Sequence, residues 1–343
     1  MEFLIHPTLN CNASCLHCGV SLPKQKINIE DLINSVYFLK STLNPDKNQT
    51  KDTFIFHGGE PMLLGINYYE NFINIINAKN ENNYAMQTNL TLYDSLWGNL
   101  FNKYNISMST SYDFFTDFRK LKNNESYFEK WKKNIKKYQD DTGKKAFVIT
   151  VISKINLPYI EDIIDISNEL QIHIKLNPLY SAGSASEFYN SISLSPKEYG
   201  EALIKAYRRW QRYRNNILFN QGITFENYII YNKKMPCPYS RNCANNIIAI
   251  LPNGDIYKCG ICSQLQINKI GNTINKTINK KIISKIKLYS SVIPEECISC
   301  GICEGGCIID FDNKNFTSQK TYYCESYKMF YNEVKNRVQN IIN

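Results

Sequence analysis

The sequence predicts an α/β protein whose first half forms an incomplete, TIM-like barrel of parallel strands, followed by a smaller cysteine-rich region. Across residues 2–177, short apolar runs alternate with amphipathic segments of helical period, which is the pattern of parallel β–α units. Six strand signals with five helical segments between them are too few for a closed eight-stranded barrel. Nine of the twelve cysteines fall within residues 237–324, so the composition changes there.

The strand signals are short and apolar, and the helical segments between them place apolar residues on one face. We expect strands at residues 3–7, 53–57, 84–88, 106–110, 146–152 and 172–177. We expect helices at about residues 29–42, 67–79, 92–103, 125–140 and 157–170.

The chain is expected to divide into a barrel at residues 1–180, a linker with a bridging helix at 181–235, and a cysteine-rich domain at 236–343. Residues 180–194 are rich in Ser, Gly and Asn, a composition typical of a linker. A final helix at about residues 325–341 has a repeating apolar face.

The bridging helix has a well-marked start. Ser195 can cap its N-terminus, Pro196 suits the first helical position, and Glu198 completes a capping box. We expect this helix to run to about Arg214.

Composition and termini favour a cytoplasmic protein. The first residues lack a basic segment followed by an apolar run, so they do not resemble a secretion signal. No stretch approaches the ~18 consecutive apolar residues that a membrane span needs, and we expect no membrane association. In a reducing compartment, twelve cysteines are expected to bind metal or perform chemistry rather than form disulfides.

Three cysteines lie on one short loop directly after the first strand signal. Cys11, Cys15 and Cys18 have the spacing Cys-x3-Cys-x2-Cys and can hold three corners of a cubane cluster. The fourth iron then has no protein ligand, and a substrate or cofactor can bind it directly. The alternative is a structural zinc site, for which His6 or His17 would supply the fourth ligand.

This loop resembles the defining motif of the radical S-adenosylmethionine (SAM) superfamily, in which the residue before the third cysteine is often aromatic, as His17 is. The resemblance implies a partial (β/α)6 barrel, a [4Fe–4S] cluster, and SAM bound to the open iron through its amino and carboxylate groups. Reductive cleavage of SAM would then give a 5′-deoxyadenosyl radical that abstracts a hydrogen atom.

A second motif supports this resemblance. Gly58, Gly59, Glu60 and Pro61 follow His57 at the end of the second strand signal. Glycines let a ligand approach the backbone closely, and a carboxylate there can accept a hydrogen bond from an ammonium group. The motif is similar to the family's site for the SAM amino group.

Polar residues at the carboxyl ends of parallel strands normally face the ligand. We expect cofactor contacts from the ends of the third, fourth and sixth strands and from a following arginine: Gln87, Asn89, Ser109, Ser111, Asn177 and Arg119. Arg119 is similar to a family arginine near the SAM carboxylate, although it is as readily a surface arginine on a loop. Asp113, beside these residues, is a candidate catalytic residue.

The C-terminal cysteines indicate two further clusters. Residues 297–307 have the Cys-x2-Cys-x2-Cys-x3-Cys spacing of bacterial ferredoxins, without the proline that usually follows. Asn253-Gly254 predicts a hairpin turn, which would place Cys259 on the second strand. Paired zinc ribbons are the alternative, but they do not require eight ligands.

The order of these cysteines resembles the SPASM domain, which carries two auxiliary [4Fe–4S] clusters. The resemblance assigns auxiliary cluster I to Cys237, Cys243, Cys259 and Cys307. It assigns auxiliary cluster II to Cys297, Cys300, Cys303 and Cys324, although the gap between Cys300 and Cys303 is shorter than in the family. The chain would then hold three [4Fe–4S] clusters, and the auxiliary pair, with no open iron, would transfer electrons.

Cys262 is left over from these ligand sets. Three roles are open for it: inert packing, substitution as a cluster ligand, and donation of a hydrogen atom to a substrate radical, as in related epimerases.

The formal charge of +9 does not by itself predict a nucleic-acid partner. Thiolate-bound clusters are anionic, and three of them would offset roughly five positive charges. The lysine pairs recur at helical spacing or near turns, as on solvated helix faces.

The resemblance favours a ribosomally made peptide as substrate, with crosslinking, oxidation or epimerisation as the outcome. Sulfatase maturases are similar but carry a catalytic Asp after the cysteine that matches Cys259, where this chain has Gly260. The cluster loop begins at residue 11, so leader recognition is expected to need the barrel mouth, the SPASM region or a separate leader-binding protein.

Two alternatives remain open at this point. One is a small-molecule substrate such as an aminoglycoside-type sugar, and the other is an electron carrier without catalysis. An enzyme of this family would also need an external electron donor such as flavodoxin or ferredoxin.

Overall fold

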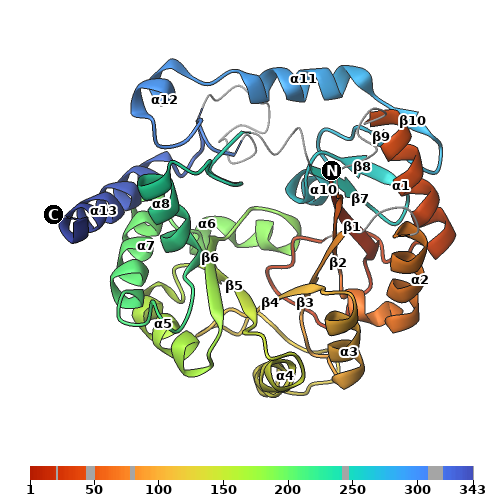
Figure 1. Ribbon diagram of the computed structural model, residues 1–343, viewed down its shortest axis with the longest axis horizontal. Helices are drawn as coiled ribbons and strands as arrows, with labels where there is room; N and C mark the ends of the chain where they lie inside the picture. The colour runs from red at the N-terminus through yellow and green to blue at the C-terminus, as the bar shows by residue number, and fades with distance from the viewer. Residues whose placement is uncertain (21, 44–50, 78–81, 242–246, 308–319, 343) are drawn as a thin grey trace.

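One ten-stranded sheet runs through the parts of the chain that the computed structural model describes, residues 1–20, 22–43, 51–77, 82–241, 247–307 and 320–342 (Figure 1). Six consecutive parallel strands form its larger part, which confirms the prediction of an open barrel. Their bounds are β1 Glu2–Thr8, β2 Thr53–Gly58, β3 Asn83–Thr88, β4 Ser107–Ser111, β5 Phe147–Ile152 and β6 His173–Pro178.

The five predicted helices lie between these strands and cover the outer face of the curved sheet (Figure 1). Local caps set several of their ends: Asp94 and Ser126 accept backbone N–H groups at two N-termini, and Gly143 ends one helix in the left-handed conformation. The helices are α1 Ile29–Leu43, α2 Ile66–Ile76, α3 Ser95–Lys103, α4 Tyr127–Thr142 and α5 Ile160–Glu169.

Side chains alternate along each strand between the core under the helices and the inside of the barrel. On β2, the buried Phe54 and Phe56 point outward and make edge-on ring contacts with Phe72 and Tyr69 of α2. His57, between Phe56 and Gly58, therefore faces the inside of the barrel. The same alternation on β3 and β4 turns polar residues inward.

The sheet continues beyond the six barrel strands. β7 Ile247–Ile250 pairs in parallel with β1, on the side of β1 opposite to β2. β8 Asp255–Tyr257, β9 Gly271–Asn272 and β10 Thr277–Ile278 follow as antiparallel neighbours. The division predicted at residue 236 follows the change in composition there. The hydrogen-bonded sheet includes strands from both sides of this position, because β7 pairs with β1.

The hairpin predicted at Asn253-Gly254 is confirmed, because β7 and β8 pair around a turn in which Gly254 has φ +80°. The placement of Cys259 on its second strand is wrong. β8 ends at Tyr257, and Cys259 caps the short helix α10 Gly260–Leu265, since its sulfur accepts the Cys262 N–H.

A group of C-terminal helices packs beside β6. Ser195 and Glu198 form the expected capping box, but the helix that follows ends at Trp210 rather than near Arg214, because a run of turns comes next. The last helix packs along α7, and Phe330 joins the rings of Tyr207 and Phe225. The bounds of this group are α7 Pro196–Trp210, α8 Asn220–Tyr231 and α13 Cys324–Ile342. Two further C-terminal helices are α11 Lys280–Ser291 and α12 Glu295–Cys300.

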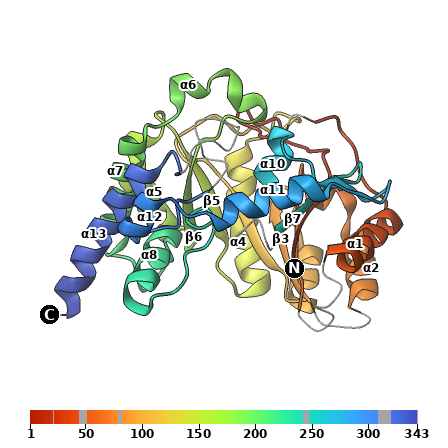
Figure 2. The ribbon, with the colours of Figure 1, turned by 90° about the horizontal axis from the view of Figure 1, so that it is seen from above.

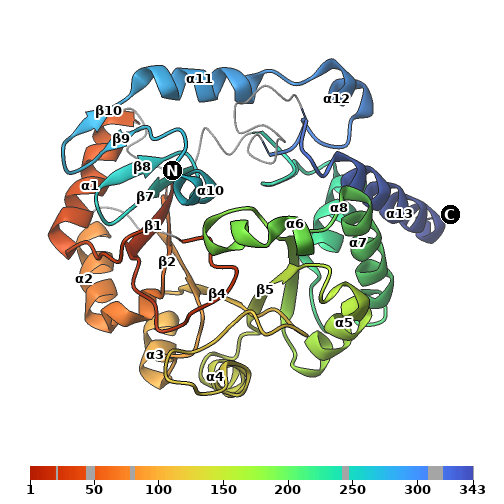
Figure 3. The ribbon, with the colours of Figure 1, turned by 180° about the vertical axis from the view of Figure 1, so that it is seen from behind.

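No helix in the described ranges combines the length and the apolar character needed to cross a bilayer. Helix α11 runs along one edge of the molecule, from the β9–β10 side of the sheet toward α12 (Figures 1 and 3).

The segment predicted as a linker packs across one end of the barrel. Its two short helices, η3 Gly183–Glu187 and α6 Tyr189–Ile192, lie in front of the strands (Figures 2 and 3). The Ser184 N–H donates to the Cys18 carbonyl at 2.9 Å. A Cβ at Gly183 would lie 2.2 Å from the same oxygen, so this glycine allows the segment to touch the cysteine loop.

This contact predicts different stabilities for two glycine variants. Gly183 and Gly143 both have left-handed φ values, +57° and +68°, but nothing lies within 4 Å of a Cβ at Gly143. We expect Gly143→Ala to lower the free energy of unfolding by about 1 kcal/mol from backbone strain alone. We expect Gly183→Ala to lower it clearly more, in urea unfolding followed by circular dichroism. Equal losses would contradict the contact.

Candidate functional site

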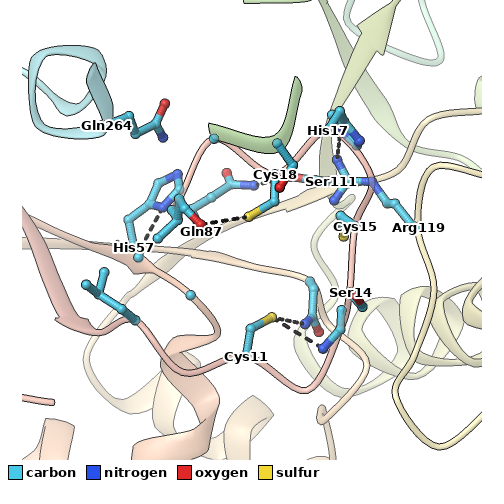
Figure 4. A pocket seen from close by; sticks show the side chains of 18 of the residues that line it. Cys11, Ser14, Cys15, His17, Cys18, His57, Gln87, Ser111, Arg119 and Gln264 are labelled. Atoms are coloured by element: carbon cyan, nitrogen blue, oxygen red, sulfur yellow. Dashed lines mark hydrogen bonds between the residues drawn. The ribbon is translucent and has the colours of Figure 1, made fainter. Parts of the chain in front are cut away.

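A cavity of about 380 Å³ opens where the loop after β1 meets the ends of β2, β3 and β4 (Figure 4). The three thiols of Cys11, Cys15 and Cys18 all lie in its wall. Among the predicted cofactor contacts, the wall also contains His17, Gly58, Gly59, Gln87, Asn89, Ser111 and Arg119. The tertiary structure therefore brings together most of the N-terminal residues that the motifs indicate.

The cysteine loop is held by backbone pairing with a distant segment. The Ser14 and Leu16 N–H groups donate to the Lys120 and Phe118 carbonyls, each at 2.8 Å. On the other side, the Cys18 carbonyl accepts the Ser184 N–H. The backbone of the loop is thus held on two sides by hydrogen bonds.

Burial raises the pKa of the Cys11 thiol, and it raises the pKa of Cys15 to about 11. The sulfur of Cys11 accepts the Ala13 N–H at 3.4 Å. Metal binding at these thiols would therefore release protons, as thiolate ligation requires.

The donor set fits a cubane cluster better than a single zinc ion. Three thiols line a cavity of about 380 Å³, whereas a structural zinc site is closed by four ligands around one ion. In the described part of the chain, no three Cys, His, Asp or Glu side chains are grouped closely enough to hold one metal ion. Room for a cluster and a further ligand lies in front of the sulfurs (Figure 4).

Two glycines allow the end of β2 to cross the base of the cysteine loop. Gly58 has φ +110°, and a Cβ there would lie 2.4 Å from the Thr8 carbonyl oxygen. A Cβ at Gly59 would lie 2.1 Å from the Asn10 carbonyl oxygen. The Gly59 and Glu60 N–H groups donate to these two carbonyls, at 2.9 and 2.8 Å. Only glycine permits this crossing, so the motif shapes the cavity floor through its backbone.

The carboxylate of Glu60 lies behind the cavity wall. It is fully buried and accepts hydrogen bonds from Met62 N at 3.0 Å, Thr88 Oγ1 at 2.7 Å and Asn89 N at 2.7 Å. Burial raises its pKa to about 7, against the effect of these hydrogen bonds. Glu60 therefore ties the end of β2 to the end of β3, and the buried Pro61 begins the short helix η1 Pro61–Leu64 beside it.

Asp113 is fully buried and holds two residues of the cavity wall. Its carboxylate lies 2.7 Å from Arg119 Nε and 3.0 Å from His17 Nε2, and it accepts the Val151 N–H at 2.8 Å. Burial opposes ionisation, but Arg119 and His17 hold the pKa of Asp113 well below its usual range. Asp113 does not line the cavity, but it contacts Arg119 and His17, which do.

His17 leaves one buried nitrogen available. Its Nδ1 atom has no hydrogen-bond partner within the described residues, while Nε2 faces Asp113. A buried imidazole nitrogen without a partner is unusual and suits a ligand in the cavity.

The ends of β3 and β4 carry a polar network. Gln87 donates to Ser111 Oγ at 2.7 Å and accepts from the Ser109 hydroxyl. Asn89 donates to Asn12 Oδ1 at 2.8 Å. Ser109 supports Gln87 without reaching the cavity, and Asn177, on β6, is not part of its wall.

His57 and Gln264 are among the wall residues that were not predicted as cofactor contacts. His57 lines the cavity, and its Nδ1 accepts the Gly58 N–H at 2.6 Å. Burial lowers the pKa of His57, so the imidazole is neutral near neutral pH. The period-two alternation of β2 was a signal for His57. Gln264 reaches the cavity from α10, and no local pattern marks it.

Four C-terminal thiols form a second group. Cys297, Cys300, Cys303 and Cys324 line one small cavity between α12 and α13. Burial, together with the charges of the other three thiols, raises the pKa of Cys303 to about 11. Cys307 is buried but lies outside this wall. This arrangement supports the assignment of these four thiols to one auxiliary cluster, which stays a prediction.

The remaining C-terminal cysteines do not share a cavity wall with this second group. Cys237 is exposed, Cys259 lies at the start of α10, and Cys243 lies outside the described residues. Cys262 is 3% exposed and packs in an apolar group with Ala249, Leu251 and Tyr257. It is not part of the wall of the first cavity, so the structure gives it no path to a substrate there.

Comparisons with known proteins agree with this geometry. Residues 5–166 match the model of the radical SAM superfamily. The chain is 26% identical to the cysteine-type anaerobic sulfatase-maturating enzyme of Clostridium novyi (strain NT), over 96% of this chain and 94% of that protein. It is 19% identical to a serine-type anaerobic sulfatase-maturating enzyme of Klebsiella aerogenes, over 87% of this chain and 76% of that protein.

Solved structures share the fold. The solved structure of native anSMEcpe with bound AdoMet (SAM) superposes on this chain with a TM-score of 0.79 at 23% identity. The match covers 99% of this chain and 98% of that one. SuiB of Streptococcus suis, bound to the precursor peptide SuiA, gives a TM-score of 0.64 at 17% identity, covering 95% of this chain and 75% of that one. Residues 5–166 are therefore a radical SAM domain, in a chain homologous to the anaerobic sulfatase-maturating enzymes.

Proposed function

We propose that this enzyme binds a [4Fe–4S] cluster on Cys11, Cys15 and Cys18 together with SAM, and abstracts a hydrogen atom from a peptide substrate. The observation that carries the proposal is the cavity in which these thiols face the glycine backbone at the end of β2. With both groups bound, cluster and SAM supply a 5′-deoxyadenosyl radical. The residues of the chain bind, orient and enclose them.

Several wall residues have chemistry suited to SAM. Gly58 and Gly59 contribute only backbone to the cavity wall, which the methionine part of SAM could approach closely. Arg119, fixed by Asp113, places positive charge where the SAM carboxylate would lie. Gln87, Asn89 and Ser111 offer donors and acceptors at the strand ends, and His17 Nδ1 offers a free ring nitrogen.

The C-terminal cysteines are proposed to bind two auxiliary clusters that carry electrons. Cluster II would use the four thiols that share one small cavity, between α12 and α13. Cluster I would use Cys237, Cys259 and Cys307 with Cys243. An acidic redox protein such as flavodoxin or ferredoxin would supply electrons, and a separate protein is proposed to bind the peptide leader.

A peptide substrate is favoured by the relatives. The chain matches sulfatase-maturating enzymes over nearly its full length, and anSMEcpe has been solved with a bound peptide. Gly260 replaces the acid that those enzymes carry after the cysteine matching Cys259, and a Cβ there would lie 2.6 Å from Leu4 Cδ2. We therefore propose a peptide other than a sulfatase.

Loss of two hydrogens is the proposed outcome. Epimerisation needs a hydrogen donor beside the substrate radical, and Cys262 is not part of the cavity wall. Oxidation or crosslinking needs only removal of a second electron and a proton, which an auxiliary cluster and solvent can take up.

Formation of 5′-deoxyadenosine tests the cofactor part of the proposal. Reconstituted enzyme given SAM and dithionite should release it, and replacement of Cys11, Cys15 and Cys18 by Ala should reduce the product to background, measured by liquid chromatography. Replacement of Cys297, Cys300 and Cys303 by Ala is the matched control. Because these thiols lie outside the first cavity, that variant should keep substrate-independent SAM cleavage. Equal loss in both variants would contradict the assignment.

Mass spectrometry tests the substrate part. Peptides encoded next to the gene should lose about two hydrogens in the presence of SAM and reductant. Uptake of one solvent deuterium without a net mass change in water would instead indicate epimerisation and contradict the proposed outcome. Modification of an aminoglycoside-type sugar, with no peptide modified, would contradict the peptide proposal.

Glu60→Gln tests the buried link between β2 and β3. The substitution replaces one accepting oxygen by an NH2 group, so at least one buried donor loses its acceptor. This loss should lower the free energy of unfolding by about 1–3 kcal/mol. We also expect a raised KM for SAM, because the cavity floor is displaced. Glu70→Gln, at an ion pair on the surface, is the control and should change stability by less than about 0.5 kcal/mol. Urea unfolding and steady-state kinetics measure both effects.

A further inference from the structure

One end of the first cavity carries two side chains whose hydrogen-bonding groups are not used by the fold. His57, on β2, and Gln264, on α10, lie on one side of the cavity, whereas His17 and Arg119 lie on the other (Figure 4). Both His57 and Gln264 are partly exposed. Within the described residues, neither Nε2 of His57 nor the amide of Gln264 has a hydrogen-bond partner. These groups are therefore available to a ligand.

The tautomer of His57 follows from its backbone contact. Nδ1 accepts the Gly58 N–H at 2.6 Å, so this nitrogen carries no proton. Burial lowers the pKa of His57, and the neutral ring keeps its single proton on Nε2. Nε2 can therefore donate one hydrogen bond at the cavity wall, and it cannot accept one.

The ring of His57 is also held in orientation by a second imidazole. His6, on β1, is 2% exposed and stacks against it, with ring centroids 5.4 Å apart and an angle of 16° between the planes. Burial lowers the pKa of His6 to about 3, so both stacked rings are neutral near neutral pH. The direction of the Nε2–H donor is thus set before any ligand arrives.

Gln264 reaches the cavity over a glycine of the cysteine loop. A Cβ at Gly19 would lie 2.7 Å from Gln264 Oε1 and 3.0 Å from its Cδ, so only a residue without a side chain leaves this space. The amide offers an oxygen acceptor together with two N–H donors. Facing the same end of the cavity, Gln264 can accept where His57 donates.

The charges of the wall restrict what this end can bind. The wall contains the basic side chains of Lys24, Arg119 and Lys122, and none of its described residues is acidic. An ammonium group would find no counter-charge there, which disfavours an aminoglycoside-type sugar with its cationic amino groups. A carboxylate has Arg119 at the opposite end (Figure 4). A neutral polar group suits the end formed by His57 and Gln264.

We propose that His57 and Gln264 bind one peptide group of the substrate. Nε2–H of His57 donates to the carbonyl oxygen, and Oε1 of Gln264 accepts the amide N–H. A peptide group has one acceptor and one donor in a fixed plane, which matches this pair. The inference rests on the proposed function in one respect, namely that a peptide enters this cavity, and it adds the two residues that select a neutral amide.

Binding of N-acetylglycine methylamide, a blocked glycyl residue, tests the pair. We would measure it by ligand-observed NMR on reconstituted full-length enzyme with SAM and without reductant. His57→Phe keeps an aromatic ring against His6 but removes the donor, and Gln264→Ala removes the acceptor. Each should weaken binding about three- to tenfold, as expected for the loss of one hydrogen bond.

Conservative variants separate recognition from a structural role. His57→Gln restores a donor and Gln264→Glu restores an acceptor, so each should bind the blocked glycine more tightly than His57→Phe or Gln264→Ala, respectively. Gln266→Ala is the matched control, because Gln266 caps the end of the same helix outside the cavity wall. It should bind the probe like the wild type.

Three results would overturn the assignment. The first is unchanged binding in His57→Phe and Gln264→Ala, or an equal loss in Gln266→Ala. The second is a methyl glucoside that binds as tightly and depends on the same two residues, because the site would then recognise hydroxyl groups. The third is a loss of SAM affinity in these variants with unchanged binding of the blocked glycine, which would assign this end of the cavity to SAM.

Failure of this inference can be told apart from failure of the proposed function. The binding measurement contains no reductant, so it does not depend on radical chemistry. Wild-type enzyme that binds the blocked glycine through both residues but never forms 5′-deoxyadenosine would contradict only the proposed function. Enzyme that modifies a peptide, while binding of the probe is insensitive to both residues, would contradict only the assignment of His57 and Gln264.

Discussion

The crossing of two backbone segments at the base of the cysteine loop is the contact on which the site depends. Gly58 and Gly59 approach the Thr8 and Asn10 carbonyl oxygens so closely that a side chain at either position would overlap them. This contact fixes the direction in which the loop leaves β1. Glu60 then joins the same point to β3 through three hydrogen bonds, so three strand ends are held together around one cavity.

Buried charge stabilises the other side of the loop. Asp113 pairs with Arg119 and His17, and its second oxygen accepts a backbone N–H from β5. A buried carboxylate is tolerated only when such partners compensate its lost hydration. The cluster of charges therefore links the cysteine loop to β4 and β5, and it orients Arg119 at the cavity. Asp113, a candidate catalytic residue from the sequence, contacts two residues of the cavity wall.

The C-terminal region is joined to the barrel rather than attached at its end. β7 pairs with β1, and this pairing brings α10 to the rim of the cavity, where Gln264 lies over Gly19. On the opposite edge, α7, α8 and α13 pack around Phe330 beside β6. The part of the chain after β6 therefore contacts both ends of the open sheet.

Local pattern in the sequence determined the six strands, the five helices between them, the capping box at Ser195 and the final helix, because each depends on residues only a few positions apart. The cysteine spacing likewise determined the first site, since one short loop carries all three thiols. Tertiary structure alone decided that β7 joins β1, that Gly183 touches the loop, and that the Glu60 carboxylate is tied to β3 behind the cavity wall. These features depend on contacts between residues far apart in the chain, and no local periodicity encodes such contacts.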